Sequence, residues 1–169
     1  FQMDYARAWD DTVAAIAEMA GISPPTVFNY FGSKENILHA LIFEGTEQKR
    51  TSHMSQPRRT GIPFADVVHA FLCELTENTL QIAGKRVWRY AESTSIRRPE
   101  SEFGQQFAHS DRELVKLMRR FLGDYDIVLR QSGETDIRLI ADLFFDRWTT
   151  RYFEFIKDDP MTLEAHFDA

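Results

Sequence analysis

The residues best suited to contact another molecule follow a glycine and a serine near the N-terminus. Pro24, Pro25 and Thr26 open a short helical pattern, in which Thr26 offers a hydroxyl for hydrogen bonding and a methyl for apolar contact. A helix of about two turns can enter the major groove of DNA, where its first residues meet the base edges. These three residues therefore predict base recognition.

Side chains with catalytic or metal-binding chemistry are present, but without the spacing that such chemistry needs. His69 and Cys73 lie one helical turn apart and could share a metal ion, yet no second pair completes a tetrahedral set. A small buried thiol beside a histidine is the ordinary explanation. The chain has no glycine-rich phosphate loop, no nucleophile elbow and no carboxylate pair with acid–base spacing. We therefore expect no enzyme, no metal and no cofactor.

The segment before Pro24 predicts a helix that ends in a tight turn. Thr12 is a plausible N-cap, and the apolar residues at helical spacing behind it are Val13, Ile16, Ala17 and Ala20. Gly21 can end this helix in the left-handed conformation, with Ile22 folded back beneath the turn. Ala17 supplies the small side chain that two steeply crossing helices need where they touch.

The segment after the turn predicts a second short helix and the start of a third. Ser23 caps the second helix, with Pro24 at the first helical position, where a missing N–H costs nothing. Val27, Tyr30 and Phe31 recur on its inner face, Gly32 ends it, and Ser33 caps the next helix. This order is that of a helix-turn-helix. An ordinary corner between two helices of an all-helical domain is the alternative.

The residues of these helices also form a specific string. Ile16-Ala17, Ala20-Gly21-Ile22-Ser23, Thr26-Val27-Phe28-Asn29-Tyr30-Phe31 and Ser33-Lys34-Glu35 together resemble the signature of the TetR family of one-component transcriptional repressors. The resemblance implies a three-helix DNA-binding head, an all-α body that binds a ligand and dimerises, and a homodimer on a palindromic double-stranded DNA operator.

The resemblance also implies roles for single residues. Pro24, Pro25 and Thr26 match the positions of major-groove contacts, and Thr12, Tyr30 and Lys34 match those that bind backbone phosphates. Asn29 is a further candidate for phosphate or base. Phe28 replaces the usual tyrosine. It can still contact a thymine methyl or a sugar of the DNA, but a phosphate hydrogen bond from that position is lost. Packing against the first helix is the alternative for Tyr30. Residues 1–11 depart from the family because they lack its glycine turn.

The charge balance of the expected head is unfavourable for DNA binding. Residues 1–50 hold four Lys or Arg against seven Asp or Glu, a net charge of −3, within a chain of net charge −6. Phosphate binding needs a basic face, so we expect modest non-specific affinity. The chain begins at Phe1 rather than Met and stops at Ala169 within a helical pattern, so we expect that residues are missing at both ends.

Composition places the chain among globular proteins of a reducing compartment. No apolar run is long enough to span a bilayer and no secretory signal opens the chain, so we expect no membrane contact. Cys73 is the only cysteine, which excludes a disulfide within one chain and favours the cytoplasm.

Beyond the head, the pattern is helical throughout. It predicts an all-α fold of about nine helices with the first truncated, because apolar residues recur at helical rather than alternating spacing. A helix from Ser33 to about His53 joins a DNA-binding domain (residues 1–48) to a ligand-binding and dimerisation domain (49–169). Residues 55–63 form a loop, Asp136 caps a helix, and Pro160 opens the last one.

The body is rich in aromatic residues, which suggests a pocket for a small hydrophobic or aromatic effector. The candidate lining comprises His69, Phe71, Trp88, Phe103, Phe107, Phe121, Tyr125, Phe144 and Trp148. His69, Arg89 or Glu92 could orient the ligand. Plain core packing is the alternative for each of these residues.

The penultimate helix is apolar on more than one face and therefore needs more than one partner. The resemblance implies a four-helix dimer interface between the last two long helices of each subunit. Its candidate residues are Phe145, Tyr152, Phe155, Leu163 and Phe167.

Three hypotheses about function remain open. The first is a repressor released by a small hydrophobic inducer, and the second is a DNA-binding regulator without an effector. The third is an all-α enzyme or adaptor in which the motif is coincidental.

Overall fold

The computed structural model describes residues 13–14, 17–18, 21–32, 34–54, 57–127 and 136–168. Val13, Ala14, Ala17 and Glu18 are helical. The elements that follow are α2 (Pro24–Phe31), α3 (Lys34–His39), the π-helical segment η1 (Ala40–Glu44), α4 (Gly45–Met54), α5 (Phe64–Ile82), α6 (Lys85–Arg97), α7 (Glu102–Gly123), α8 (Ile137–Lys157) and α9 (Leu163–Phe167). Every regular element in these ranges is a helix, so the predicted all-α class is confirmed.

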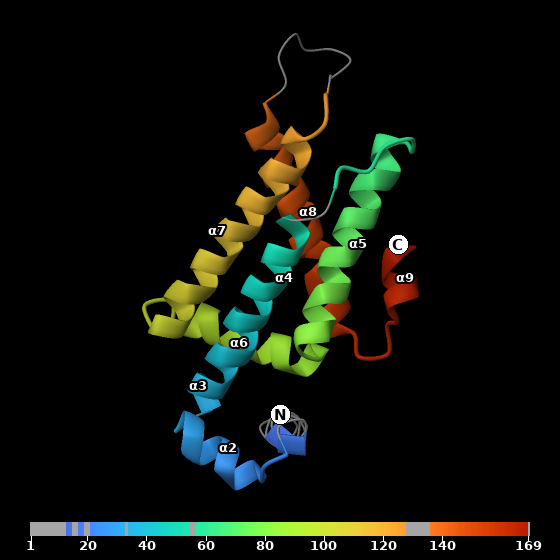
Figure 1. The fold of residues 1–169 in the computed structure, drawn as a ribbon. Coiled ribbons are helices and arrows are strands. Elements are labelled where there is room, and N and C mark those ends of the chain that lie inside the picture. The colour runs from blue at the N-terminus through green and yellow to red at the C-terminus, as the bar shows by residue number, and fades with distance from the viewer. Residues whose placement is uncertain are drawn as a thin grey trace.

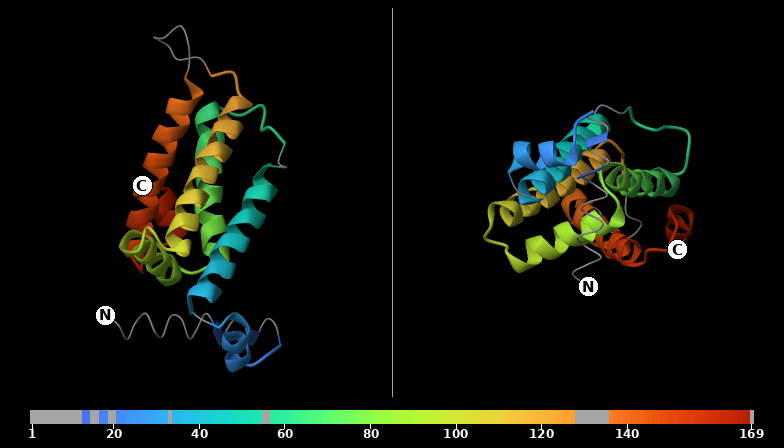
Figure 2. Two further views of the ribbon diagram at one scale, coloured as in Figure 1. Left: turned by 90° about the vertical axis from the view of Figure 1, so that its left-hand side faces the viewer. Right: turned by 90° about the horizontal axis from the view of Figure 1, so that it is seen from below.

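The helices form a small head and a longer body. Helices α4, α5, α7 and α8 run along the body, and α6 crosses its end nearest the head (Figure 1). The head holds α2 below that end, and the left-hand view of Figure 2 shows the same separation from another side. We call residues 13–39 the head and residues 45–168 the body. The predicted boundary at residue 48 falls within α4.

The helix starts follow from local capping chemistry. The Asp136 carboxylate accepts a hydrogen bond from the Arg138 backbone N–H at 2.9 Å, which confirms the predicted cap of α8. The Ser101 hydroxyl accepts from Gly104 N–H at 3.1 Å and caps α7 in the same way. The last helix does not begin at Pro160 as predicted. It begins at Leu163, because the Thr162 hydroxyl accepts from Ala165 N–H at 3.1 Å.

One continuous helical stretch, residues 34–54, joins the head to the body. It contains the π-helical turn η1, where the Phe43 ring lies 5.2 Å from that of Phe103 and 6.4 Å from that of Phe107 on α7. On the next turn, Gly45 lies so close to α5 that an added Cβ would be 2.9 Å from a methyl of Ile82. The π turn and this close contact fix the stretch against the body just below α4.

The core of the body is largely aromatic. Phe71 and Phe121 stack with ring centroids 4.0 Å apart and join α5 to α7. The Trp148 indole N–H donates to the Thr76 hydroxyl at 3.1 Å, which satisfies two buried polar groups between α8 and α5. These contacts explain why an unusually aromatic chain packs several of its rings as ordinary core.

Candidate DNA interface and ligand cavity

The turn before α2 is closed by a pair of backbone hydrogen bonds. Gly21 has a φ of 65° and its N–H donates to Glu18 O at 3.1 Å, while Ile22 N–H donates to Ala17 O at 2.9 Å. This is the Schellman arrangement, which satisfies the last carbonyls of a helix and needs a left-handed residue. Ala17 is buried at the crossing as predicted. Ile22 is 43% exposed, so it does not fold beneath the turn as predicted.

The first turn of α2 presents its side chains to solvent. Ser23 is the N-cap in extended conformation, but its hydroxyl bonds the Thr26 hydroxyl at 2.8 Å rather than a backbone N–H. Pro24, Pro25 and Thr26 are all exposed. Because both prolines lack an N–H and Thr26 N–H donates to Ser23 O at 2.9 Å, this helix end offers few backbone donors to an anion. Recognition here must come from side chains.

The remaining residues of α2 divide between packing and solvent. Val27 is buried, and Phe28 and Phe31 are half-buried. Tyr30 is 83% exposed, and its ring packs edge-on against the Phe31 ring at a centroid distance of 5.1 Å. The expectation that Tyr30 faces inward is therefore wrong: although it lies three residues after the buried Val27, its side chain reaches solvent near the end of α2. Its hydroxyl is available to a phosphate.

Three of the predicted contact residues need separate mention. Asn29 is exposed on α2. Thr12 and the side chain of Lys34 lie outside the described part of the chain. Beside them, the Asn36 amide donates to Phe31 O at 2.7 Å and ties the start of α3 to the end of α2. Pro24, Pro25, Thr26, Asn29 and Tyr30 thus belong to one short exposed helix.

This geometry defines a helix-turn-helix DNA-binding protein. Residues 5–41 match the family model described as bacterial regulatory proteins, tetR family. The match confirms the resemblance: the chain carries the DNA-binding domain of the TetR family and is a DNA-binding transcriptional regulator. No curated protein and no solved structure matches the chain.

The body contains a cavity of about 730 Å³ whose lining residues come from η1 and α4 to α8. This volume suits a small organic ligand. Of the predicted pocket residues, Trp88, Phe107 and Trp148 line it. Phe145 and Tyr152, which were assigned to a dimer interface, line it as well.

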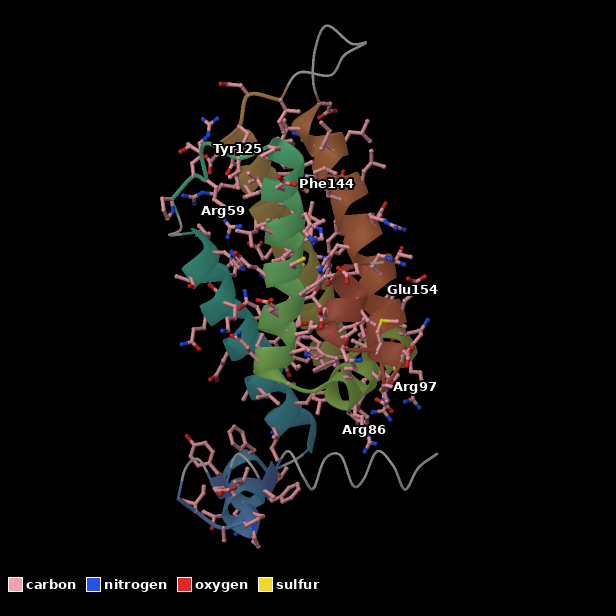
Figure 3. The ribbon with its side chains drawn as sticks, turned by 90° about the vertical axis from the view of Figure 1, so that its right-hand side faces the viewer. Arg59, Arg86, Arg97, Tyr125, Phe144 and Glu154 are labelled. Carbon is pink, nitrogen blue, oxygen red and sulfur yellow. The ribbon has the colours of Figure 1, made fainter. Side chains whose placement is uncertain are left out.

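The other predicted pocket residues lie elsewhere. Phe71, Phe121 and Tyr125 line a separate hollow of about 140 Å³ at the end of the body away from the head, where Figure 3 shows Tyr125 and Arg59. Tyr125 has a structural role there, because its hydroxyl accepts from Arg59 N–H at 3.1 Å. The remaining positions are Phe103, which packs on Phe43; Phe144, which is half-buried on α8; and His69, which is exposed. Aromatic content could not separate these environments.

The predicted interface residues are mostly buried within their own subunit. Tyr152 is 3% exposed and Phe155 is 1% exposed, because α8 packs on several helices of its own chain. Leu163 and Phe167 are half-buried on α9. The exposed apolar residues of α8 are instead Leu139 and Leu143, one turn apart and each 57% exposed.

Two carboxyl groups of the cavity wall have shifted pKa values. Burial, together with the smaller effect of the negative charge of Asp111 on α7, raises the pKa of Glu92 on α6 to about 7. Burial also raises the pKa of Asp111 to about 6, against the opposing effect of Arg112. Asp111 is closely surrounded by protein but still reaches solvent, so it lies at the edge of the cavity. Sequence reasoning named Glu92 as an orienting group and missed Asp111, since nothing in the spacing joins them.

Polar contacts hold α4 on the cavity wall. Arg50 donates to Glu113 on α7 at 3.1 Å and to Glu47 on its own helix at 2.5 Å. His53 bonds Asn78 on α5 at 2.7 Å, and burial lowers the pKa of His53. The helix that leaves the head therefore forms part of the wall around the cavity.

A metal site and a membrane-spanning helix can both be checked against the described residues. The Cys73 sulfur lies 3.5 Å from His69 Nε2, but the described residues bring no group of three His, Cys, Asp or Glu together around a metal position. None of the helices within the described ranges is long and apolar enough to cross a bilayer.

Proposed function

We propose that the protein is a ligand-responsive repressor, which binds a palindromic operator as a homodimer and is released when a small hydrophobic effector fills the body cavity. The observation that carries the proposal is the position of α4. It lines the cavity through Arg50 and His53, and it continues without a break into the head that bears the exposed edge of α2.

The mechanism follows from this continuity. A ligand that widens the cavity displaces α4, and the head moves with α4 because residues 34–54 form one helical stretch. Two heads must meet half-sites about one DNA turn apart, so a small change in their separation weakens operator binding. Reciprocally, operator binding lowers the affinity for the ligand by the same factor.

The proposed dimer contact uses the exposed part of α8. Leu139 and Leu143 present one apolar face, and a two-fold interface would bring this face against its copy. The Arg119 guanidinium on α7 donates to Asp142 at 2.9 Å beside the same face. This assignment replaces the buried Tyr152 and Phe155 with residues that a partner can reach.

The proposal is tested with purified protein and DNA from upstream of its own gene. A gel shift should show one specific complex, and light scattering should give the mass of a dimer on and off DNA. A screen of lipophilic compounds should find ligands that raise the melting temperature and dissociate the complex. Absence of specific DNA binding overturns the proposal. If the protein binds DNA specifically but no stabilising ligand weakens that binding, the protein is a regulator without a small-molecule effector.

Two variants of α2 should separate base recognition from phosphate contact. Thr26→Ala removes the hydroxyl and methyl that reach base edges, so affinity for the best operator should fall about tenfold while other sequences change little. Tyr30→Phe removes one exposed hydroxyl, so affinity should fall by a similar factor on every sequence. Binding to a panel of operator variants measures both. Equal losses on all sequences for Thr26→Ala would contradict its assignment.

The Arg50–Glu113 pair should set the resting position of α4. Glu113→Gln removes the ion pair that links α4 to α7, so operator affinity should fall severalfold without ligand. Glu77→Gln on α5 is the matched control, since it removes the same charge from an exposed position. Fluorescence anisotropy with labelled operator measures both. Identical affinities of the two variants would show that the pair does not couple α4 to the heads.

A further inference from the structure

We propose that the effector is an aromatic or other apolar organic cation, an amine whose positive charge is held by Glu92 with Asp111 at the cavity edge. This inference rests on the proposed function and names the chemical class of ligand for the same cavity. It is carried by three features: aromatic walls, an unpaired carboxylate and a buried hydroxyl without a partner.

The apolar part of the ligand is inferred from the walls. The aromatic residues that line the cavity are Phe43, Trp88, Phe107, Phe145, Trp148, Tyr152 and Phe153. Trp148 and Tyr152 stack on one another with centroids 5.0 Å apart. Such walls favour flat apolar groups, and aromatic faces also attract cations.

The positive charge is inferred from how the acidic residues of the wall are paired. Glu47 and Glu113 are neutralised by Arg50, and Glu113 also bonds Lys116 at 2.7 Å. Glu92 makes no ion pair with a basic group of the described chain, and the charged group that contributes to its raised pKa is Asp111, which has the same sign. An uncompensated carboxylate in a mostly apolar cavity is costly, and a bound cation would remove that cost.

A buried hydroxyl gives independent support. Tyr152 is 3% exposed, and no described residue forms a hydrogen bond of good geometry with its hydroxyl, although the Thr79 side chain approaches it. Burial raises the pKa of Tyr152 well above its ordinary value, and the charge of Glu92, which lines the same cavity, contributes to the rise. The Thr149 hydroxyl, on the same helix and the same cavity wall, is also buried and has no hydrogen-bond partner among the described residues. A ligand amine would supply the donors that these oxygens lack.

An anionic ligand fits the same wall poorly. Arg50 is engaged by two carboxylates, and Lys49 donates to Gln81. His53 bonds Asn78, and burial disfavours its charged form. Each of these basic groups is therefore already bonded to another side chain of the protein, whereas Glu92 forms no ion pair with a described residue.

Affinity for a cation should depend on pH. The pKa of Glu92 is about 7 in the empty cavity, so a cation that needs its ionised form should bind about tenfold more tightly at about pH 8 than at about pH 6. Asp111, with a pKa of about 6, contributes in the same direction. The other titratable or charged groups of the wall are Glu47, Lys49, Arg50 and His53 from α4, His109 and Glu113 from α7, and Tyr152 from α8.

The experiment uses three fluorescent probes of one shape: anthracenylmethylamine, anthracenylmethanol and anthracene carboxylate. Titration into the dimer should show the amine binding most tightly, with the pH dependence given above. Glu92→Gln should weaken amine binding by at least about tenfold and abolish most of its pH dependence, while binding of the alcohol stays unchanged. Glu77→Gln, an exposed carboxylate on α5, should change neither.

Two outcomes would overturn the inference. If the alcohol or the carboxylate binds as tightly as the amine, the cavity binds ligands but does not select charge, and the proposed function stands. If none of the probes binds, the cationic class is wrong, and the gel shift decides separately whether the protein is still a DNA-binding regulator. Loss of DNA binding in the parent chain would instead remove the proposed function.

Stability provides a readout that needs no ligand. Because the pKa of Glu92 is raised from its ordinary value of 4.5 to about 7, the folded state binds more protons than the unfolded state between these values. Stability therefore falls as pH rises from about 4.5 to about 7. Glu92→Gln should melt at a higher temperature than the parent at about pH 8 and at a similar one at about pH 4.5. A lower melting temperature at both would show that Glu92 is a structural acceptor instead.

Discussion

A Thr26→Glu variant should fold at least as stably as the parent chain and bind operator at least about a hundredfold more weakly. The two effects have opposite signs because a carboxylate at this position is favourable for the N-terminus of α2 and unfavourable for the DNA. Thr26 is exposed in the first turn of α2, which contains no acidic residue.

The stability of α2 should rise for two reasons. Glutamate three residues after the N-cap Ser23 forms a capping box, in which its carboxylate accepts from the Ser23 N–H. The Ser23 hydroxyl, which now bonds the Thr26 hydroxyl, becomes free to accept from a backbone N–H. A carboxylate in the first turn also interacts favourably with the helix dipole, by about 0.3–1 kcal/mol.

DNA binding should fall because the same carboxylate meets the bases and phosphates of the groove. Like charges juxtaposed in an interface cost several kcal/mol, and the head already carries an acidic excess. Thr60→Glu, in the exposed loop before α5, is the matched control and should leave affinity within about twofold. Thermal melting and fluorescence anisotropy measure the two effects. Wild-type affinity in Thr26→Glu would mean that α2 does not enter the groove.

A Gly104→Ala variant should lower the free energy of unfolding by about 3 kcal/mol. An added Cβ would lie 2.4 Å from the Arg98 carbonyl oxygen and 2.9 Å from the Pro99 Cα, both of which are backbone atoms. No rotation of a side chain relieves this overlap. The start of α7 must shift, and the hydrogen bond from Gly104 N–H to the Ser101 hydroxyl weakens with it.

Gly123→Ala is the matched control at the other end of α7. Nothing lies within 4 Å of a Cβ added there, so the substitution should be neutral or slightly stabilising. For a chain of this size the expected loss in Gly104→Ala corresponds to roughly 6–12 °C in melting temperature. Calorimetry of both variants measures the difference. Equal melting temperatures would mean that the turn before α7 can shift to accept the added Cβ without loss of stability.

Features that depend on neighbours in the chain were predictable from the sequence. The helix-turn-helix could be predicted because Gly21, Ser23 and Gly32 act through their own backbone and adjacent peptide groups. Gly21 and Gly32 both have positive φ, and Ser23 is the N-cap of α2. Asp136 caps α8 for the same local reason. The all-α class followed from the period of the apolar residues, which is a property of each segment alone.

Only the tertiary structure decided which aromatic residues line the large cavity of the body. Phe71 stacks on Phe121, whereas Trp148, equally apolar in sequence, lines the cavity. Tyr30, predicted on the inner face of its helix, is exposed in the tertiary structure. Tyr152, predicted at the dimer interface, is buried within its own subunit.

The effect of Asp111 on Glu92 depends on how α6 packs against α7, and so does the lack of a basic partner for Glu92 among the described residues. The helical period of a sequence shows which residues share one face of one helix. Which groups surround that face depends on how several helices cross, and the sequence of a single helix does not predict this.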